Sequence, residues 1–476
     1  MKILNKFYID GAWVDPIGHA TMPIMNPATA SQIGTVSLGS AADVDRAVGA
    51  AKRAFETFSL TSKAERLALL ENLRVQTKAR MADLAAAITA EMGAPARLAS
   101  GSQAGAGLGH LDHFIAALKV MEDEETLPNG DIISREPIGV CGLITPWNWP
   151  INQIALKVVP ALATGATCVL KPSEHTPLSA QIYAEIVHAA GYPAGVFNLV
   201  QGDGPTVGAA MSRHPDIAMM SFTGSTRAGA LVSKDAADNV KRVTLELGGK
   251  SPNLVFADAD LPKSVADSVA ECFQNSGQSC NAPTRMLVER SCYDQVIELA
   301  KTAGENQKVG DPAQLGDHIG PVFDKIQYDR VQAMIQVGID EGARVLVGGV
   351  GKPAGLEGGW YVKPTIFCDV DQDMRISREE IFGPVLVITP FDTEADAITM
   401  ANDTDYGLAA YIRSGDAARV SRVARRLRAG AIHINGRGPD YGSPFGGYKQ
   451  SGNGREGGVF GLEDYLEVKV RPPFTA

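Results

Sequence analysis

The sequence predicts an α/β protein with a parallel sheet and more than one domain. Its 476 residues are too many for one ordinary hydrophobic core, so two or three domains are expected. From residue 139, apolar runs of strand length alternate with helical stretches, which is typical of βαβ units. Further apolar runs with helices between them follow Ser251 and predict a second α/β domain.

Composition excludes several classes of protein. The chain is 45% hydrophobic, has a mean hydropathy of −0.03, and carries a net charge of −10 with a pI near 5.4. This acidic balance argues against a general nucleic-acid or anionic-membrane surface. No signal-type apolar stretch opens the chain and no later run approaches 18 apolar residues, so we expect a cytoplasmic protein without membrane contact. The six cysteines show neither a CxxC nor a metal-ligand spacing, which predicts free thiols and no metal.

The first 115 residues open with a short strand-like segment. Residues 6–14 are β-like and contain Asp10-Gly11, a hairpin turn signal. Apolar residues then recur at three- and four-residue spacing over 43–58 and 62–92, which predicts amphipathic helices with a structural role.

The βαβ region contains five predicted strands and two clear helices between them. Because ligands bind beyond the carboxyl ends of parallel strands, the residues that follow each strand are the first place to look for a site. The predicted strands are 139–145, 166–170, 196–200, 217–222 and 242–247, and the helices include 151–162 and 178–190.

Polar motifs follow four of these strands. They are Pro146-Trp-Asn-Trp-Pro150, Lys171-Pro-Ser-Glu174, the glycine-containing turn 223–229, and Glu246. Four polar strand ends therefore converge on one rim. Gly224 and Ser225, at a strand-to-helix turn, can offer backbone N–H groups and a hydroxyl to a phosphate. The segment 202–208 has one residue too many for G-x-G-x-x-G, and residues 249–251 lack the first glycine of a P-loop.

Two short stretches carry candidate chemistry. In the alternating run 243–249, Glu246 lies at the end of a strand, directly before Gly248-Gly249. In 274–280, a turn of small residues presents Cys280 on a loop. Taken singly, a surface glutamate and a small buried cysteine are the commoner structural roles.

The motifs together resemble those of the aldehyde dehydrogenase superfamily over nearly the whole chain. Besides the motifs at residues 146–150 and 171–174, they comprise Phe222–Thr226, Leu245–Pro252, Gly277–Cys280, Glu379–Pro384 and Pro444–Lys449, in the family's order. The resemblance implies a Rossmann-like, parallel-sheet NAD-binding domain (1–120 and 138–249), a second α/β catalytic domain (250–447) and a small β oligomerisation arm (121–137 and 460–476).

By the same resemblance the protein is an NAD-dependent aldehyde dehydrogenase that releases a carboxylic acid. Cys280 is then the nucleophile, Glu246 the general base, and the side-chain amide of Asn148 part of the oxyanion hole. Lys157 and Glu456 match a pair proposed to relay protons. A thiolate, neutral donors and a carboxylate are the groups that addition, oxyanion stabilisation and thioester hydrolysis require.

The resemblance also implies cofactor and substrate residues. A carboxylate at Glu174 is expected to select NAD over NADP by accepting a hydrogen bond from the adenosine ribose, although Lys171 tempers this preference. The cofactor residues are Ile144, Thr145, Trp147, Lys171, Ser173, Glu174, Gly204, Gly224, Ser225, Leu247, Glu380 and Phe382. The substrate residues are Trp149, Gln274, Arg437 and Phe445, with Arg437 as an anchor for a distal carboxylate.

Two alternatives remain at the level of sequence. A CoA-acylating dehydrogenase shares the fold and the thioester but typically lacks a glutamate at the position of Glu246. A catalytically idle homologue is expected to lose Cys280 or Glu246, and both are present. The family implies a homodimer or homotetramer, while the physiological aldehyde does not follow from the sequence.

Overall fold

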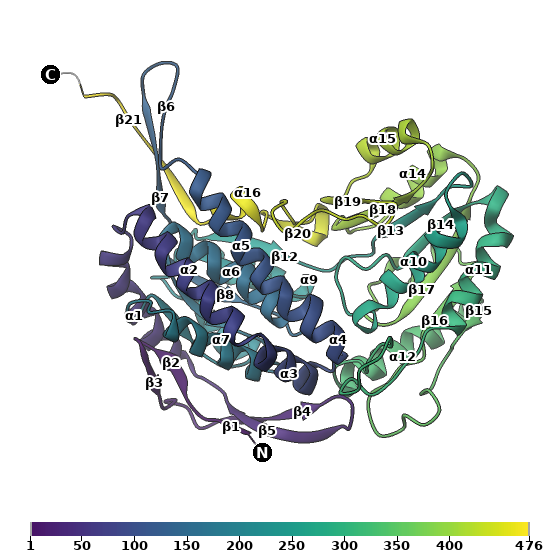
Figure 1. Cartoon of the computed structure of the whole chain (residues 1–476), viewed down its shortest axis with the longest axis horizontal. Helices are drawn as coiled ribbons and strands as arrows, with labels where there is room; N and C mark the ends of the chain where they lie inside the picture. Colours follow the sequence, from purple (N-terminus) through teal and green to yellow (C-terminus); the bar gives the residue numbers. More distant parts are fainter. Residues whose placement is uncertain (1, 475–476) are drawn as a thin grey trace.

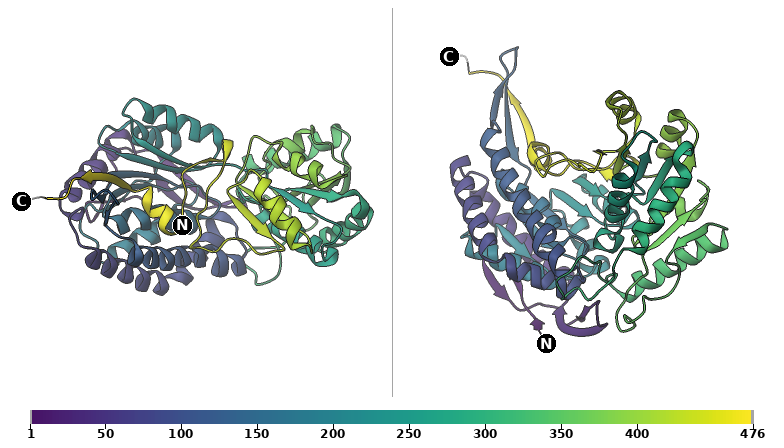
Figure 2. Two further views of the ribbon diagram at one scale, coloured as in Figure 1. Left: turned by 90° about the horizontal axis from the view of Figure 1, so that it is seen from above. Right: turned by 45° about the vertical axis from the view of Figure 1, so that its right-hand side comes forward.

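The computed structural model describes residues 2–474, and it consists of two lobes and a projecting arm (Figure 1). The first lobe is built on an eight-stranded sheet and the second lobe on a seven-stranded sheet. The arm carries β6 (Glu124–Thr126), β7 (Ile132–Pro137) and β21 (Leu466–Arg471), and the described C-terminal end lies beside it (Figures 1 and 2). Within the described residues, no helix is long and apolar enough to cross a membrane.

The sheet of the first lobe confirms the predicted parallel core and adds antiparallel edges. Strands β12, β11, β8, β9 and β10 run parallel, whereas β20 at one edge and the hairpin β2–β3 at the other are antiparallel. The order across the sheet is β20 (Gly452–Asn453), β12 (Arg242–Glu246), β11 (Met219–Thr223), β8 (Val140–Ile144), β9 (Thr167–Lys171), β10 (Phe197–Leu199), β2 (Phe7–Ile9) and β3 (Ala12–Val14).

Helices cover both faces of this sheet, which explains why its central strands are apolar throughout. In β8, Cys141 and Leu143 face one cluster of buried side chains, and Val140 and Ile144 face the other. The first cluster packs against α2 (Lys63–Ala79), α3 (Met81–Met92), α5 (Ala104–Val120), α6 (Pro150–Thr164) and α7 (Pro177–Ala189). The second packs against α1 (Ala41–Phe58), α8 (Ala209–Arg213) and α9 (Thr226–Ala237).

The sequence prediction of the N-terminal region was right in its elements and wrong in one boundary. The hairpin forms, with Asp10 and Gly11 both at positive φ (56° and 76°). The helix expected over 62–92 is two helices, because the chain leaves helical geometry at Arg80 (φ −110°, ψ 9°). A small sheet of β1 (Lys2–Leu4), β5 (Ser31–Ser37) and β4 (Thr21–Asn26) was not predicted.

The second lobe is a doubly covered α/β sheet in which successive side chains alternate between two cores. In β17, Leu386 and Ile388 face α10 and α11, whereas Val385 and Val387 face α12. The strand order is β15 (Arg344–Val347), β16 (Thr365–Cys368), β17 (Val385–Phe391), β14 (Arg285–Glu289), β13 (Pro252–Val255), β18 (Ala409–Arg413) and β19 (Ala431–Ile434). Its helices are α10 (Leu261–Phe273), α11 (Tyr293–Glu305), α12 (Lys325–Asp340), α14 (Glu394–Asn402) and α15 (Ala417–Arg426).

Short helices complete the chain, and the C-terminal segment returns to the first lobe. The short helices are α4 (Ala96–Leu98), α13 (Arg375–Arg378) and α16 (Gly458–Glu463). Beyond the second lobe, β20 pairs with the outer edge of β12, and β21 then pairs with β7 along six residue pairs. The two segments expected to form the arm, 121–137 and 460–476, are therefore joined in one sheet.

Candidate active site

The carboxyl ends of β12, β11, β8 and β9 meet along one edge of the first sheet, as the sequence predicted. The register pairs Thr223 with Glu246 and Ile144 with Lys171, so the polar residues that end these strands are neighbours. Residues 274–280 of the second lobe lie across from this edge, because Gly249 approaches the backbone of Cys280. A Cβ added at Gly249 would stand 2.3 Å from the Cys280 carbonyl oxygen, so only glycine allows this approach.

Cys280 follows a turn of three consecutive residues in the left-handed region. Asn275, Ser276 and Gly277 have φ values of 54°, 58° and 71°. A Cβ at Gly277 would lie 2.0 Å from the carbonyl oxygen of Gly383, so glycine is required there by sterics as well as by its φ. This turn follows the C-terminal end of α10. Cys280 comes directly after it and is partly exposed, whereas the other five cysteines are buried.

Buried amide side chains hold this turn against the start of α6. The Asn148 Nδ2 donates to the Gln278 carbonyl oxygen at 3.0 Å. The Asn148 carbonyl oxygen accepts from Gln103 Nε2 and from Asn275 Nδ2, both at 3.0 Å. Asn148 was predicted, but Gln103 and Asn275 were not, because no sequence pattern links residues so far apart. One of the two N–H groups of the Asn148 amide remains available to a ligand.

Trp149, predicted as a substrate residue, is fixed next to Cys280. Its indole Nε1 donates to the Ser279 hydroxyl at 2.8 Å. Asn148 and Trp149 come from the same loop after β8, and Ser279 and Cys280 are adjacent in sequence. The loop after β8 is therefore tied to the cysteine turn by side chains as well as by backbone contacts.

Glu246 is a buried carboxylate without a hydrogen-bond partner. Neither carboxylate oxygen is paired among the described residues, and the side chain is 4% exposed. Burial raises the pKa of Glu246 well above its usual range, and the nearby carboxylate of Glu456 raises it further. A buried, unpaired carboxyl with a raised pKa is the pattern of a general base or acid rather than of a structural ion pair.

The predicted relay pair, Lys157 and Glu456, is brought together from opposite ends of the chain. Lys157 Nζ donates to Glu456 Oε1 at 2.5 Å and to the Ser221 hydroxyl at 3.1 Å. Both side chains are buried, and the second oxygen of Glu456 has no partner among the described residues. Burial raises the pKa of Glu456, although Lys157 opposes this shift. Two further buried titratable groups, Glu456 and Lys157, therefore lie near Glu246.

The other side of the strand-end rim has features suited to a dinucleotide. Ser225 caps α9, whose first N–H groups point at the rim. The buried hydroxyls of Thr145 and Thr223 have no hydrogen-bond partner in the described part of the chain. Lys171 Nζ binds Glu174 Oε2 at 3.0 Å. Burial alone would raise the pKa of Glu174, but Lys171 and a backbone N–H outweigh it and lower the pKa.

The remaining predicted cofactor residues surround the same rim. Glu380 Oε1 accepts from the Gly249 N–H at 2.9 Å, and Phe382 adopts a positive φ of 59°. The Trp147 ring stacks on Phe323, which was not predicted, with 4.1 Å between centroids, and meets Phe382 edge-on at 5.5 Å. Ile144 and Leu247 are buried in the core beneath the rim, Ser173 is buried next to Lys171, and Gly204 begins the π-helical turn Gly204–Gly208.

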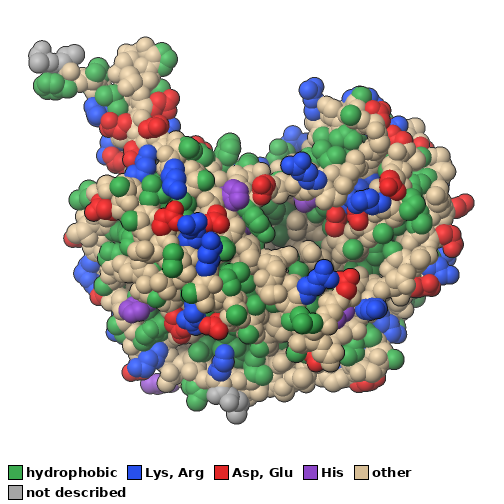
Figure 3. Space-filling model, in the orientation of Figure 1, with side chains coloured by type: hydrophobic (Ala, Val, Ile, Leu, Met, Phe, Trp, Pro, Cys, Tyr) green, Lys and Arg blue, Asp and Glu red, His purple; other side chains and the backbone are tan. Residues whose placement is uncertain are grey.

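A cavity of about 470 Å³ opens next to Cys280, where the surface is hollowed between the two lobes (Figure 3). Three predicted substrate residues, Trp149, Gln274 and Phe445, line it. The fourth, Arg437, does not: it is exposed and lies in a tight turn closed by the Ile434–Arg437 pairing. The lining of this cavity therefore gives no support to Arg437 as a substrate anchor, and that role stays a prediction. The cavity also has lining residues that were not predicted, among them Glu271, Tyr411, His433 and Tyr441.

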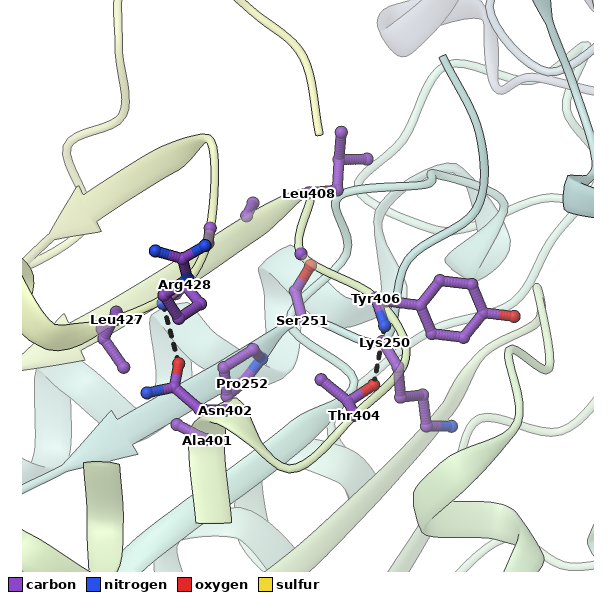
Figure 4. Close-up of a pocket in the computed structure, with 14 residues that line it drawn as sticks. Lys250, Ser251, Pro252, Ala401, Asn402, Thr404, Tyr406, Leu408, Leu427 and Arg428 are labelled. Carbon is purple, nitrogen blue, oxygen red and sulfur yellow. Dashed lines mark hydrogen bonds between the residues drawn. The ribbon is translucent and has the colours of Figure 1, made fainter. Parts of the chain in front are cut away.

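A second, much smaller cavity lies beneath Lys250 and Ser251 (Figure 4). Its volume of about 10 Å³ has room for no more than a water molecule. The Lys250 ammonium is buried without a partner among the described residues, and burial lowers its pKa to about 7. This cavity is too small for an aldehyde or a nucleotide, so the 470 Å³ cavity is the candidate substrate site.

Comparison with known proteins identifies relatives along the whole chain. The model of the aldehyde dehydrogenase family matches residues 13–471. A 3-succinoylsemialdehyde-pyridine dehydrogenase of a Pseudomonas species is 52% identical over 474 residues, which cover 99% of this chain and 98% of the relative.

Solved structures agree with this result. An aldehyde dehydrogenase of Bartonella henselae is 51% identical, with a TM-score of 0.97 and 99% of each chain covered. Aldehyde Dehydrogenase C of Pseudomonas syringae is 50% identical, with a TM-score of 0.97 and coverage of 98% of this chain and 96% of that one. The latter was solved as a cysteine-to-alanine mutant in complex with NAD+ and octanal.

Proposed function

The chain belongs to the aldehyde dehydrogenase family, and from this membership and the site geometry we propose that it oxidises an aldehyde to the carboxylic acid with NAD. The observation that carries the proposal is that Cys280, which lines the 470 Å³ cavity, lies near the buried carboxylate of Glu246, which has no hydrogen-bond partner among the described residues. The NAD+ and octanal bound to the Pseudomonas syringae relative support the same chemistry.

The first half-reaction is assigned to Cys280 and Asn148. The thiol releases its proton to solvent in the cavity, and the resulting thiolate adds to the aldehyde carbon, which gives a tetrahedral oxyanion. The free N–H of the Asn148 amide and the backbone N–H of Cys280 stabilise this oxyanion. Partial burial of the sulfur and the nearby carboxylates of Glu380 and Glu246 raise the pKa of the Cys280 thiol, so the ligand-free site keeps it protonated. NAD, when bound, supplies the acceptor for the hydride that leaves the tetrahedral carbon.

The second half-reaction is assigned to Glu246. A water molecule attacks the thioester carbon, its proton passes to the Glu246 carboxylate, and the carboxylic acid leaves Cys280. Glu456 and Lys157 then carry that proton away, which their 2.5 Å contact beneath Glu246 supports. The same carboxylate favours water over CoA as the acyl acceptor, so the CoA-acylating alternative is the less supported one.

Residues of the first lobe, together with Glu380 and Phe382 of the second lobe, are assigned to hold NAD. Lys171 and Glu174 bind the adenosine ribose, Gly224 and Ser225 at the start of α9 meet the pyrophosphate, and Glu380 holds the nicotinamide ribose. The unpaired hydroxyls of Thr145 and Thr223 support a polar ligand along this edge. Ile144, Trp147, Ser173, Gly204, Leu247 and Phe382 complete the proposed cofactor site.

A direct assay tests the proposal. The purified protein with NAD and a simple aldehyde such as octanal should form NADH and octanoate in equal amounts, without CoA. NADH formation that depends on CoA, or a complete absence of turnover with a panel of aldehydes, would contradict it.

Replacing Glu174 with serine should shift cofactor preference towards NADP by about tenfold or more, since the ionised carboxylate repels a 2′-phosphate. The ratio of kcat/KM for NAD and NADP measures this shift. Asp216→Ser removes a carboxylate on the surface of the same lobe and should leave the ratio unchanged. A wild type that already prefers NADP overturns the assignment. Because the Lys171 ammonium can partly neutralise a 2′-phosphate, we expect a preference for NAD and not complete exclusion of NADP.

We further propose that the lobes correspond to functional domains and that the arm joins subunits. The first lobe is the NAD-binding domain, the second the catalytic domain, and β6, β7 and β21 form an oligomerisation arm in a homodimer or homotetramer. The exposed Val468 and Val470 on β21 support a partner for this sheet.

A cytoplasmic location stays a prediction. The six free cysteines are compatible with it.

A further inference from the structure

The charged groups that line the 470 Å³ cavity are all acidic. They are Glu271, Asp440 and Glu456, and the described lining residues include neither lysine nor arginine. The histidines do not compensate for this. Burial lowers the pKa of both His110 and His433 to about 4, so both rings are uncharged at neutral pH. An aldehyde that enters the cavity therefore meets a negative or neutral wall.

The three carboxylates differ in how far their charge is cancelled. Glu456 is paired with buried Lys157 at 2.5 Å, so it contributes little net charge. Glu271 Oε2 accepts from the buried guanidinium of Arg413 at 2.5 Å, so the charge of this carboxylate is largely cancelled as well, although the carboxylate and not the guanidinium lines the cavity. Asp440 is exposed and forms no salt bridge among the described residues.

Aromatic rings make up much of the remaining wall. Trp149, Tyr411, Tyr441 and Phe445 line the cavity, and His433 stacks on Tyr411 with 4.2 Å between ring centroids. Ring faces carry negative electrostatic potential, so a wall of ring faces favours uncharged or cationic groups over anions. A volume of about 470 Å³ is enough for an aldehyde with a chain or ring well beyond its carbonyl.

An aldehyde with a second carboxylate finds no counter-ion in this cavity. Arg437, the cation nearest in sequence to the lining loop, is exposed and outside it. A carboxylate buried without a partner loses its hydration without compensation, and a neighbouring carboxylate adds repulsion.

We propose that the enzyme uses uncharged or cationic aldehydes and discriminates against aldehydes with a distal anionic group, because the cavity lining holds the carboxylates of Glu271 and Asp440 and no cation. This inference rests on the proposed function and specifies its substrate class. Glu271 acts at the distal part of the substrate and takes no part in the chemistry at Cys280.

Two aldehydes of equal length test it, 6-oxohexanamide and 6-oxohexanoate, because their charge difference lies far from the reacting carbon. The amide should have the higher kcat/KM by about tenfold or more, mainly through a lower KM. Glu271→Gln should narrow the ratio severalfold by lowering KM for the anion, while kcat for the amide changes little.

Further variants keep the result interpretable. Asp267→Asn removes a carboxylate one turn earlier on α10, outside the cavity wall, and should leave the ratio as in the wild type. Asp440→Asn changes an exposed side chain and should not affect folding, so it should narrow the ratio of kcat/KM for the two aldehydes even if Glu271→Gln destabilises the protein.

Equal use of both aldehydes by the wild type overturns the inference and leaves the proposed function standing. Turnover of neither aldehyde counts against the function itself. A loss confined to the anion in Arg437→Ala also overturns the inference, because it would identify a cationic anchor.

Discussion

Replacement of Cys280 by alanine is expected to abolish aldehyde-dependent NADH formation, with a loss of roughly 10⁴-fold or more in kcat. We expect this loss because of where Cys280 lies in the structure. Cys280 is the one cysteine that is not buried, and it alone follows the left-handed turn at Asn275–Gly277. NAD binding, measured by calorimetry or fluorescence, should be retained, because the substitution replaces none of the proposed cofactor residues.

Cys292→Ala is the matched control for this variant. Cys292 is buried at the start of α11, so its loss should leave kcat near the wild-type value. Appreciable turnover by Cys280→Ala in the absence of contaminating dehydrogenase would remove Cys280 from the mechanism.

Glu246→Gln should separate the two half-reactions. The nucleophile and the oxyanion donors remain, so one equivalent of NADH should form in a burst and an acyl group should accumulate on Cys280, detectable by mass spectrometry. Steady-state turnover should fall by about 10²- to 10⁴-fold, the usual contribution of a general base.

The pH dependence gives a second readout for the same variant. Because burial and Glu456 raise the pKa of Glu246, the carboxyl is protonated at acid pH and becomes a base only as the pH rises through that raised value. Wild-type kcat should therefore increase with pH along this limb, and the limb should disappear in Glu246→Gln. Glu467→Gln, on the exposed arm strand, serves as the control with an unchanged profile. Undiminished turnover of Glu246→Gln near neutral pH contradicts the assignment.

The periodicity of the sequence was enough to predict the elements that are buried on both faces or lie next to strong turn signals. The runs at β8, β9 and β11 are apolar because helices cover both faces of their sheet, and this pattern is local. The break between α2 and α3 was missed because Arg80 is an ordinary helix former and neither glycine nor proline marks this boundary in the sequence.

Candidate site residues were predicted where they belong to a motif and missed where they act across the chain. Cys280, Glu246 and Asn148 each lie within a short diagnostic stretch. Gln103 and Asn275, which hold Asn148, are joined to it only by folding, and Glu271 carries no local sign that it faces a cavity. Arg437 was chosen because its chemistry suits a carboxylate, but it is exposed and absent from the cavity lining, and the sequence gives no sign of this.

The return of the C-terminal segment to β12 has a consequence for synthesis of the protein on the ribosome. The outer edge of β12, which carries Glu246, stays unpaired until residues 452–453 have been made, and the buried ammonium of Lys157 lacks its partner until Glu456 emerges. The entire second lobe is translated in between. A nascent chain that stops before residue 452 therefore contains both the base and the nucleophile but an open sheet edge and an uncompensated buried charge. Such fragments should depend on chaperones, and the active centre is completed among the last steps of folding.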